Sequence, residues 1–114
     1  MANEKSRRVL IAEDDEQIQT FYHACLGSLS VECDVVGDGA EAVQAYRESS
    51  YKLVLLDCCM PGMDGYEAAR RIREHERVTG AQRTPIVSIS SRAEWTQCEA
   101  AGMDCCRRCK SAEK

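Results

Sequence analysis

The fold and the candidate site are both decided by one stretch of the sequence, Leu53-Val54-Leu55-Leu56-Asp57-Cys58-Cys59-Met60-Pro61-Gly62-Met63-Asp64-Gly65. Four apolar residues run directly into Asp57, and a Met-Pro-Gly turn follows soon after. A short unbroken apolar run bounded by turn residues is typical of a strand buried on both faces of a parallel sheet. A carboxylate at the end of such a strand is energetically costly unless it has a partner. The pattern therefore indicates a functional role for Asp57, with a turn or cap residue as the alternative.

Residues 9–12 form a second short apolar run, 31–36 alternate weakly and are rich in valine, and 85–90 also have the character of a strand; each of these segments is followed by one with helical features. The predicted strands cover residues 9–12, 31–36, 53–57 and 85–90, and the predicted helices cover about 16–28, 38–48, 64–77 and 91–101. Asp38, Asp64 and Ser91 each precede a glutamate by three residues, which is the spacing of a helix capping box. Four consecutive strand–helix units predict an α/β protein with a doubly wound parallel sheet and helices on both faces.

Length and composition indicate a single globular domain. The chain has 114 residues, of which 44% are hydrophobic and 30% are charged, and its formal net charge is -4. We assign residues 1–7 to a leader, 8–110 to the domain and 111–114 to a tail. The negative charge argues against nucleic-acid binding, and no apolar run is long enough for a membrane span or a signal peptide. We therefore expect a cytoplasmic protein whose eight cysteines are mostly reduced thiols.

Acidic residues follow two of the predicted strands. Glu13 and Asp14 end the first strand and Asp57 ends the third, and right-handed crossovers place these strands side by side. Three converging carboxylates repel one another unless a divalent cation lies between them, and Mg²⁺ suits such oxygen ligands. Ser90 adds a hydroxyl at the end of the fourth strand, which completes the parts needed for phosphoryl transfer to a carboxylate. The alternative is that residues 13–15 only favour a helix N-terminus.

Together these motifs resemble the response regulator receiver domains of two-component signalling, the CheY-like family with a flavodoxin-like (βα)₅ fold. The similar segments are Val9-Leu10-Ile11-Ala12-Glu13-Asp14-Asp15, residues 53–65, Pro85-Ile86-Val87-Ser88-Ile89-Ser90-Ser91 and Ala100-Ala101-Gly102-Met103-Asp104. They correspond to the first strand with its acidic pair, the phosphorylation-site strand and loop, the fourth strand, and the segment before the fifth strand. The resemblance covers about residues 8–104, and the combination of spaced motifs is highly specific.

The resemblance implies a phosphoacceptor domain rather than an enzyme. Asp57 would accept a phosphoryl group from a phosphohistidine on a histidine kinase or a histidine phosphotransfer protein. Asp14, Asp57 and the backbone carbonyl of Cys59 would bind Mg²⁺ directly, and Glu13 would act through water. Ser90 occupies the place of the family's switch hydroxyl.

The C-terminal part departs from the family pattern. Counted from Gly102, the position of the family's lysine falls on Cys109, and Lys110 lies one residue late. A one-residue shift turns a strand side chain to the opposite face, so Lys110 reaches the phosphoryl site only through a bulge or a slipped register. Cys106 falls where the family usually has an aromatic switch residue. The fifth strand is predicted to be weak, and the final helix is missing.

A missing final helix would leave part of the sheet uncovered. The helix over 16–28 would have to cover that face alone, so we expect parts of Val9, Ile11 and the third strand to lie open. An open apolar face and a poorly paired sheet edge both favour self-association.

Other functional hypotheses rest on weaker motifs. A degenerate receiver could act only as a protein-interaction module. Cys98, Cys105, Cys106 and Cys109 could indicate a metal or redox-sensing protein, but a lone C-x-x-C is a weak signal. Residues 37–42 form a G-x-G-x-x-A string that could bind a dinucleotide. A phosphatase with an aspartate nucleophile is disfavoured, because Cys59 stands where its second aspartate would be.

Overall fold

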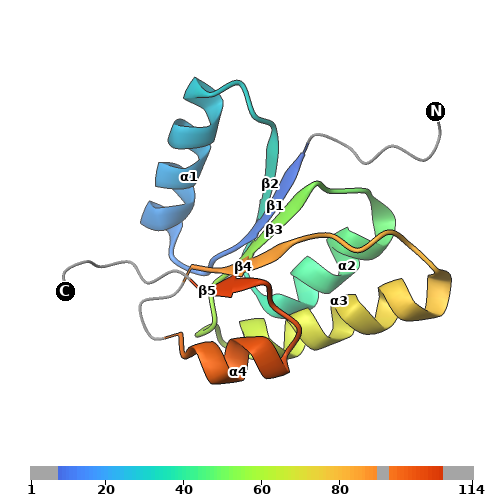
Figure 1. Ribbon diagram of the computed structural model, residues 1–114. Coiled ribbons are helices and arrows are strands. Elements are labelled where there is room, and N and C mark those ends of the chain that lie inside the picture. Colours follow the sequence, from blue (N-terminus) through green and yellow to red (C-terminus); the bar gives the residue numbers. More distant parts are fainter. Residues whose placement is uncertain (1–7, 90–92, 107–114) are drawn as a thin grey trace.

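The structure is a computed structural model that describes residues 8–89 and 93–106. Its parallel sheet has the strand order β2-β1-β3-β4-β5, as Figure 1 shows. The strands are β1 (Val9–Ala12), β2 (Cys33–Val36), β3 (Leu53–Leu56), β4 (Ile86–Ser88) and β5 (Cys105–Cys106). The helices are α1 (Glu16–Ser28), α2 (Gly39–Glu48), α3 (Gly65–Thr79) and α4 (Trp95–Ala100). The predicted α/β fold with a doubly wound parallel sheet is confirmed.

The main core lies between the sheet and helices α2 and α3, which pack together on the face opposite α1 (Figure 1). Alternate strand residues point into this core, as the two-residue period of a strand requires. The fully buried members from the strands and α3 are Leu10, Ala12, Val54, Leu56, Ile86, Ala68, Ala69 and Ile72. This packing fixes the register of the central strands and therefore the positions of the residues that follow them.

The other face of the sheet is covered unevenly by α1, none of whose residues is fully buried. The expectation that Val9 and Ile11 lie open is wrong, since these side chains are only 2% and 0% exposed. β1 is paired on both sides with β2 and β3, so neighbouring side chains as well as α1 shield it. Leu53 and Leu55 are partly exposed, as predicted for the third strand.

Some element boundaries differ from the sequence prediction. β2 begins at Cys33 rather than at residue 31, and the regular part of β4 is only Ile86–Ser88. Helix α4 begins at Trp95, so its N-cap is Glu94 rather than Ser91, and Glu94 makes no side-chain capping hydrogen bond.

The predicted weak fifth strand is a two-residue strand that pairs with β4 at Val87 and Ser88. The predicted leader and tail lie outside the described residues, as does the expectation that a final helix is absent. Within the described ranges, no helix combines the length and the apolar character that crossing a membrane requires.

Candidate metal and phosphoryl site

Three carboxylates meet at the carboxyl edge of the two central strands. Ala12 of β1 and Leu56 of β3 are partners in the sheet register, and the Asp57 N–H donates to the Ala12 carbonyl at 3.0 Å. The residues that follow the two strands are therefore neighbours. One carboxylate oxygen each from Glu13, Asp14 and Asp57 lies within 4.8 Å of the others, and no second such group of metal-ligating side chains occurs in the part of the chain that the structure describes.

The electrostatics of this cluster favour a cation. Glu13 is only 4% exposed, and burial raises its pKa to about 7. The neighbouring carboxylates of Asp57 and Asp14 act in the same direction, against a hydrogen bond from the Asp15 N–H to Glu13 Oε2 at 3.0 Å. In the absence of a cation, Glu13 therefore holds its proton close to neutral pH. A divalent ion among these oxygens would replace that proton.

The loop after β3 is shaped by short-range backbone contacts. The Cys59 N–H donates to Asp57 Oδ1 at 3.0 Å, which orients the carboxylate. A Cβ at Gly65 would come within 2.4 Å of the Asp57 carbonyl oxygen, so only glycine lets the start of α3 approach the end of β3 this closely. Gly62 has a φ of +73°, in the left-handed region that favours glycine. The Pro-Gly-Met-Asp-Gly sequence therefore builds a compact turn behind Asp57.

Asp15 has a different role from the other acids at this edge. Its carboxylate accepts hydrogen bonds from the N–H groups of Gln17 at 2.8 Å and Ile18 at 3.3 Å, so it is the N-cap of α1. The helix-cap interpretation is therefore right for Asp15. It does not account for Glu13, whose side chain accepts from the Asp15 N–H and lies in the acidic cluster with Asp14 and Asp57.

The remaining predicted site residues are only partly described. Cys59 lies exposed in the loop beside Asp57, where its backbone N–H contacts the carboxylate. Ser90, Cys109 and Lys110 lie outside the described residues. Their roles stay predictions.

A buried polar cluster behind the acidic edge was missed by the sequence prediction. Cys58 Sγ lies 3.0 Å from Ser88 Oγ, and both residues are buried. The Tyr66 hydroxyl hydrogen-bonds with Cys58 and accepts from the Glu94 N–H at 3.4 Å. One signal was present in the sequence: Ser88 follows the buried Ile86 at the two-residue period of a strand, which points its hydroxyl inward.

The dinucleotide hypothesis is not supported at the start of α2. Asp38 is the N-cap of this helix and accepts from the Glu41 N–H, while Glu41 accepts from the Gly37 N–H. The Gly39 N–H donates to the Met63 carbonyl, and a Cβ at Gly39 would lie 2.4 Å from that oxygen. Gly39 therefore makes room for the loop before α3. This loop occupies the space at the start of α2 that a pyrophosphate would need.

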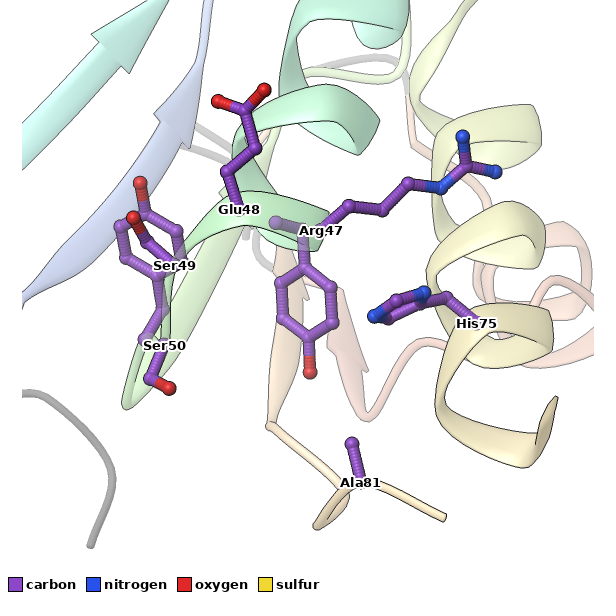
Figure 2. A pocket seen from close by; sticks show the side chains of 8 residues that line it. Arg47, Glu48, Ser49, Ser50, His75 and Ala81 are labelled. Carbon is purple, nitrogen blue, oxygen red and sulfur yellow. The ribbon is translucent and has the colours of Figure 1, made fainter. Parts of the chain in front are cut away.

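A pocket of about 250 Å³ lies at the opposite edge of the sheet, beside the end of α2 and the residues that connect it to β3 (Figure 2). It is lined by Tyr46, Arg47, Glu48, Ser49, Ser50, Tyr51, His75 and Ala81. The Tyr46 hydroxyl is already engaged, since it bonds to Glu76 at 2.5 Å and to Thr84 at 2.8 Å. Arg47 favours an anion here, whereas Glu48 and the C-terminal dipole of α2 favour a cation. The lining selects no ligand class, so the acidic edge is the better candidate.

The cysteines whose side chains are described do not form a metal centre. None of Cys25, Cys33, Cys58, Cys59 and Cys98 forms a disulfide, and Cys58 and Cys98 are buried. The Sγ atom of Cys33 lies 3.6 Å from Nδ1 of His23, and burial raises the pKa of the Cys33 thiol. A raised pKa makes the thiol less reactive. The metal or redox interpretation therefore gains no support from these residues.

Comparison with known proteins assigns the chain to a family. Residues 9–106 match the response regulator receiver domain. A probable histidine kinase 2 of Oryza sativa subsp. indica is 38% identical over 97 residues, which cover 73% of this chain and 9% of that protein. The chain thus spans about a tenth of the length of this relative.

Two solved receiver domains have the same fold. That of sensor histidine kinase PA1611 from Pseudomonas aeruginosa PAO1 is 31% identical, with a TM-score of 0.81 over 94% of this chain and 88% of that chain, and holds a magnesium ion in its active-site cleft. That of the histidine kinase CKI1 from Arabidopsis thaliana, complexed with Mg²⁺ and BeF₃⁻, is 30% identical, with a TM-score of 0.80 over 91% of this chain and 81% of that chain. The family match over residues 9–106 and these similarities show that the chain belongs to the response regulator receiver domain family.

Proposed function

We propose that this chain is a phosphoacceptor domain in which Asp57 is the residue that is phosphorylated. A carboxylate oxygen of Asp57 attacks the phosphorus of a phosphohistidine, an acyl phosphate forms, and the P–N bond to the imidazole breaks. The observation that carries this proposal is the convergence of Glu13, Asp14 and Asp57 at neighbouring strand ends. The chain supplies a nucleophile and a cation site, so it acts as a phosphoryl acceptor and at most catalyses its own phosphorylation and dephosphorylation.

Mg²⁺ is the cofactor that this cluster fits. Two direct ligands of one octahedral Mg²⁺ lie at most about 4.2 Å apart, close to the 4.8 Å limit within which the carboxylate oxygens lie. Asp14, Asp57 and the Cys59 carbonyl would bind the ion directly, and Glu13 would bind it through water. When bound, the ion neutralises charge that develops on the transferring phosphoryl oxygens.

Groups close to Asp57 orient the acceptor carboxylate. The hydrogen bond from the Cys59 N–H to Asp57 Oδ1 leaves the other carboxylate oxygen as the nucleophile. We assign to Ser90 and Lys110 the contacts with the transferred phosphoryl group, within a functional domain of residues 8–110. A positive charge at that place would stabilise the phosphorylated form.

The partner that follows from this role is a histidine kinase or a histidine phosphotransfer protein. The relative from Oryza sativa is named as a probable histidine kinase, and this chain matches only 9% of it. A receiver of this kind could therefore work as one module of a larger kinase or beside one in the cytoplasm. Direct contact with nucleic acid or membrane is not needed for the reaction.

A second candidate role is that of a protein-interaction module, which can also self-associate. Helix α1 has large exposed apolar side chains, with Phe21 61% and Ile18 40% exposed. Apolar side chains gathered on one surface are typical of an interaction site. Light scattering over a range of concentrations, with reductant present, separates self-association from a monomer that binds only a partner.

Phosphorylation with acetyl phosphate and Mg²⁺ tests the main proposal, with intact-mass spectrometry as the readout. We expect one added phosphate on the wild type and none on Asp57→Asn. Asp38→Asn is the matched control, because Asp38 only caps α2 and asparagine caps a helix equally well. Equal labelling of the wild type and Asp57→Asn would disprove the assignment. Omission of Mg²⁺ should also prevent labelling.

A further inference from the structure

A polar cluster formed by the buried Cys58 and Ser88 and the half-buried Tyr66 connects the proposed phosphoryl site to helix α4. Cys58 is the residue after Asp57, and its Sγ atom lies 3.0 Å from Ser88 Oγ in the next strand. The Tyr66 hydroxyl hydrogen-bonds with Cys58 from the first turn of α3. The same hydroxyl accepts the Glu94 N–H at 3.4 Å, directly before the first residue of α4. A continuous series of polar contacts therefore runs from the end of β3 to the start of α4.

The direction of the hydrogen bonds follows from the protonation of Tyr66. Burial raises the pKa of Tyr66, and the hydrogen bond with Cys58 raises it further. The phenol is therefore neutral at physiological pH, and it can donate its single proton to Cys58 Sγ while it accepts from the Glu94 N–H. A change at Cys58 consequently alters the group that holds Glu94.

Helix α4 begins without a side-chain cap, although Ala93 just before it is buried in the core. It has six residues, and its N-cap Glu94 makes no side-chain capping hydrogen bond. The Tyr66 contact is long for a hydrogen bond to a hydroxyl, and long bonds are weak. A weakly held helix start can be shifted by a small change in free energy, which is the requirement for a two-state element.

The loop geometry transmits a change at Asp57 to this cluster. The Gly65 N–H donates to the Cys58 carbonyl at 3.3 Å, and Gly65 directly precedes Tyr66. A Cβ at Gly65 would lie only 2.4 Å from the Asp57 carbonyl oxygen, so the two backbones have no free space between them. Movement of the Asp57–Cys58 backbone therefore displaces the start of α3 and the Tyr66 ring that it carries.

We propose that Tyr66 is a positioning residue that couples the Asp57 end of β3 to the start of helix α4 through its hydrogen bonds with Cys58 and the Glu94 N–H. The proposal rests on the proposed phosphoacceptor function. Phosphorylation moves Cys58, the Tyr66 hydroxyl changes its partners, and the Glu94 N–H is released or recaptured. The exposed face of α4 then differs between the two states.

The fluorescence of Trp95 tests this coupling, because Trp95 is the single tryptophan and the first residue of α4. It is measured in the full chain with Mg²⁺ and either acetyl phosphate or beryllofluoride. We expect the wild type to show a change in emission and Tyr66→Phe to lose at least about half of its amplitude. Phosphate incorporation by Tyr66→Phe should stay within about threefold of the wild-type rate, because the substitution leaves Asp57 and the proposed Mg²⁺ ligands unchanged.

Two controls separate coupling from a structural role. Tyr51→Phe removes a different tyrosine hydroxyl, which bonds to Asp34 at 2.7 Å far from α4, and should keep the full amplitude. Cys58→Ser keeps a hydrogen-bonding group and should keep most of the response, whereas Cys58→Ala should reduce it. A purely structural effect of Tyr66→Phe would lower the melting temperature without changing the amplitude per folded molecule.

Different outcomes test the coupling and the proposed function separately. Equal amplitudes in wild type and Tyr66→Phe would overturn the coupling, as would a wild type in which neither reagent changes Trp95 emission. A beryllofluoride response that requires Tyr66, found without phosphate on Asp57, would support the coupling and contradict the phosphoacceptor assignment.

Discussion

Two buried glutamates lie at opposite edges of the same sheet, and their surroundings are opposite in kind. Glu13 is 4% exposed and Glu76 is 7% exposed. Glu76 is surrounded by donors: Arg73 Nη1 and the Thr84 N–H each at 2.9 Å, and the Tyr46 hydroxyl at 2.5 Å. Glu13 lies beside two other carboxylates and accepts the N–H of Asp15.

The comparison shows how a structural buried carboxylate differs from a functional one. A buried charge is stable when a countercharge and hydrogen bonds compensate its loss of water, which is the situation of Glu76. A buried carboxylate beside other carboxylates lacks that compensation within the protein. Glu13 therefore destabilises the folded state until a proton or a cation arrives, and a cation in the proposed metal site would offset this cost.

Removal of Glu76 should have the largest effect on stability. In Glu76→Ala, the Tyr46 hydroxyl and the Thr84 N–H lose an acceptor, and Arg73 keeps only its bonds to Asp104 and to the Gly102 and Thr84 carbonyls. We expect the free energy of unfolding to fall by about 3 kcal/mol, the lower end for breaking a buried pair. Urea denaturation followed by circular dichroism measures this loss. Glu74→Ala, in an exposed pair with Arg77, should change it by less than about 0.5 kcal/mol, and a similar value for Glu76→Ala would contradict the comparison.

Neutralisation of Glu13 should raise the free energy of unfolding, whereas removal of Glu76 should lower it. Burial raises its pKa from 4.5 to about 7, so the folded state keeps a proton that the unfolded state has lost over that range. Stability therefore falls as pH rises from 4.5 to 7, and the cost is complete above pH 7. Without Mg²⁺ at pH 8, we expect Glu13→Gln to raise the free energy of unfolding by about 2 kcal/mol.

Denaturation of the Glu13→Gln variant across this pH range provides the measurement. The fall in stability between pH 4.5 and pH 7 should be present in the wild type and smaller in the variant. A variant that is less stable than the wild type at pH 8 would show that Glu13 is compensated inside the protein, as Glu76 is.

The contrast between the two glutamates explains which features the sequence could predict. The acidic edge follows from local signals, because Asp57 ends an apolar strand and the crossover rule places it beside Glu13. The environment of Glu76 depends on side chains from α2, α3 and the loop before β4, which no sequence spacing brings together. The Tyr66–Glu94 contact also joins residues far apart in the sequence. The predicted start of α4 is wrong because the helix begins after Glu94 rather than after Ser91.

Addition of Mg²⁺ should stabilise the folded chain through the acidic edge, and this gain should not depend on Glu76. A ligand that binds only the folded state raises its stability by about 1.4 kcal/mol at ten times the dissociation constant. We expect this gain for the wild type and for Glu76→Ala, and its loss in Asp57→Asn. Thermal denaturation with a Mg²⁺ series gives the measurement. A gain that persists in Asp57→Asn would place the ion elsewhere.

The smallest predicted effect concerns Asp15, which lies at the same edge of the sheet as the proposed metal site but is not one of its ligands. Asp15 accepts the N–H groups of Gln17 and Ile18 and caps α1, so Asp15→Ala should lower the free energy of unfolding by about 1 kcal/mol. Asp15→Asn should restore nearly all of this loss, because asparagine caps as well as aspartate. The Mg²⁺-dependent gain should be the same in both variants as in the wild type, since the proposed metal site consists of Glu13, Asp14 and Asp57 without Asp15. A parallel loss of Mg²⁺ stabilisation in Asp15→Asn would show that the Asp15 charge, and not only its capping oxygen, belongs to the site.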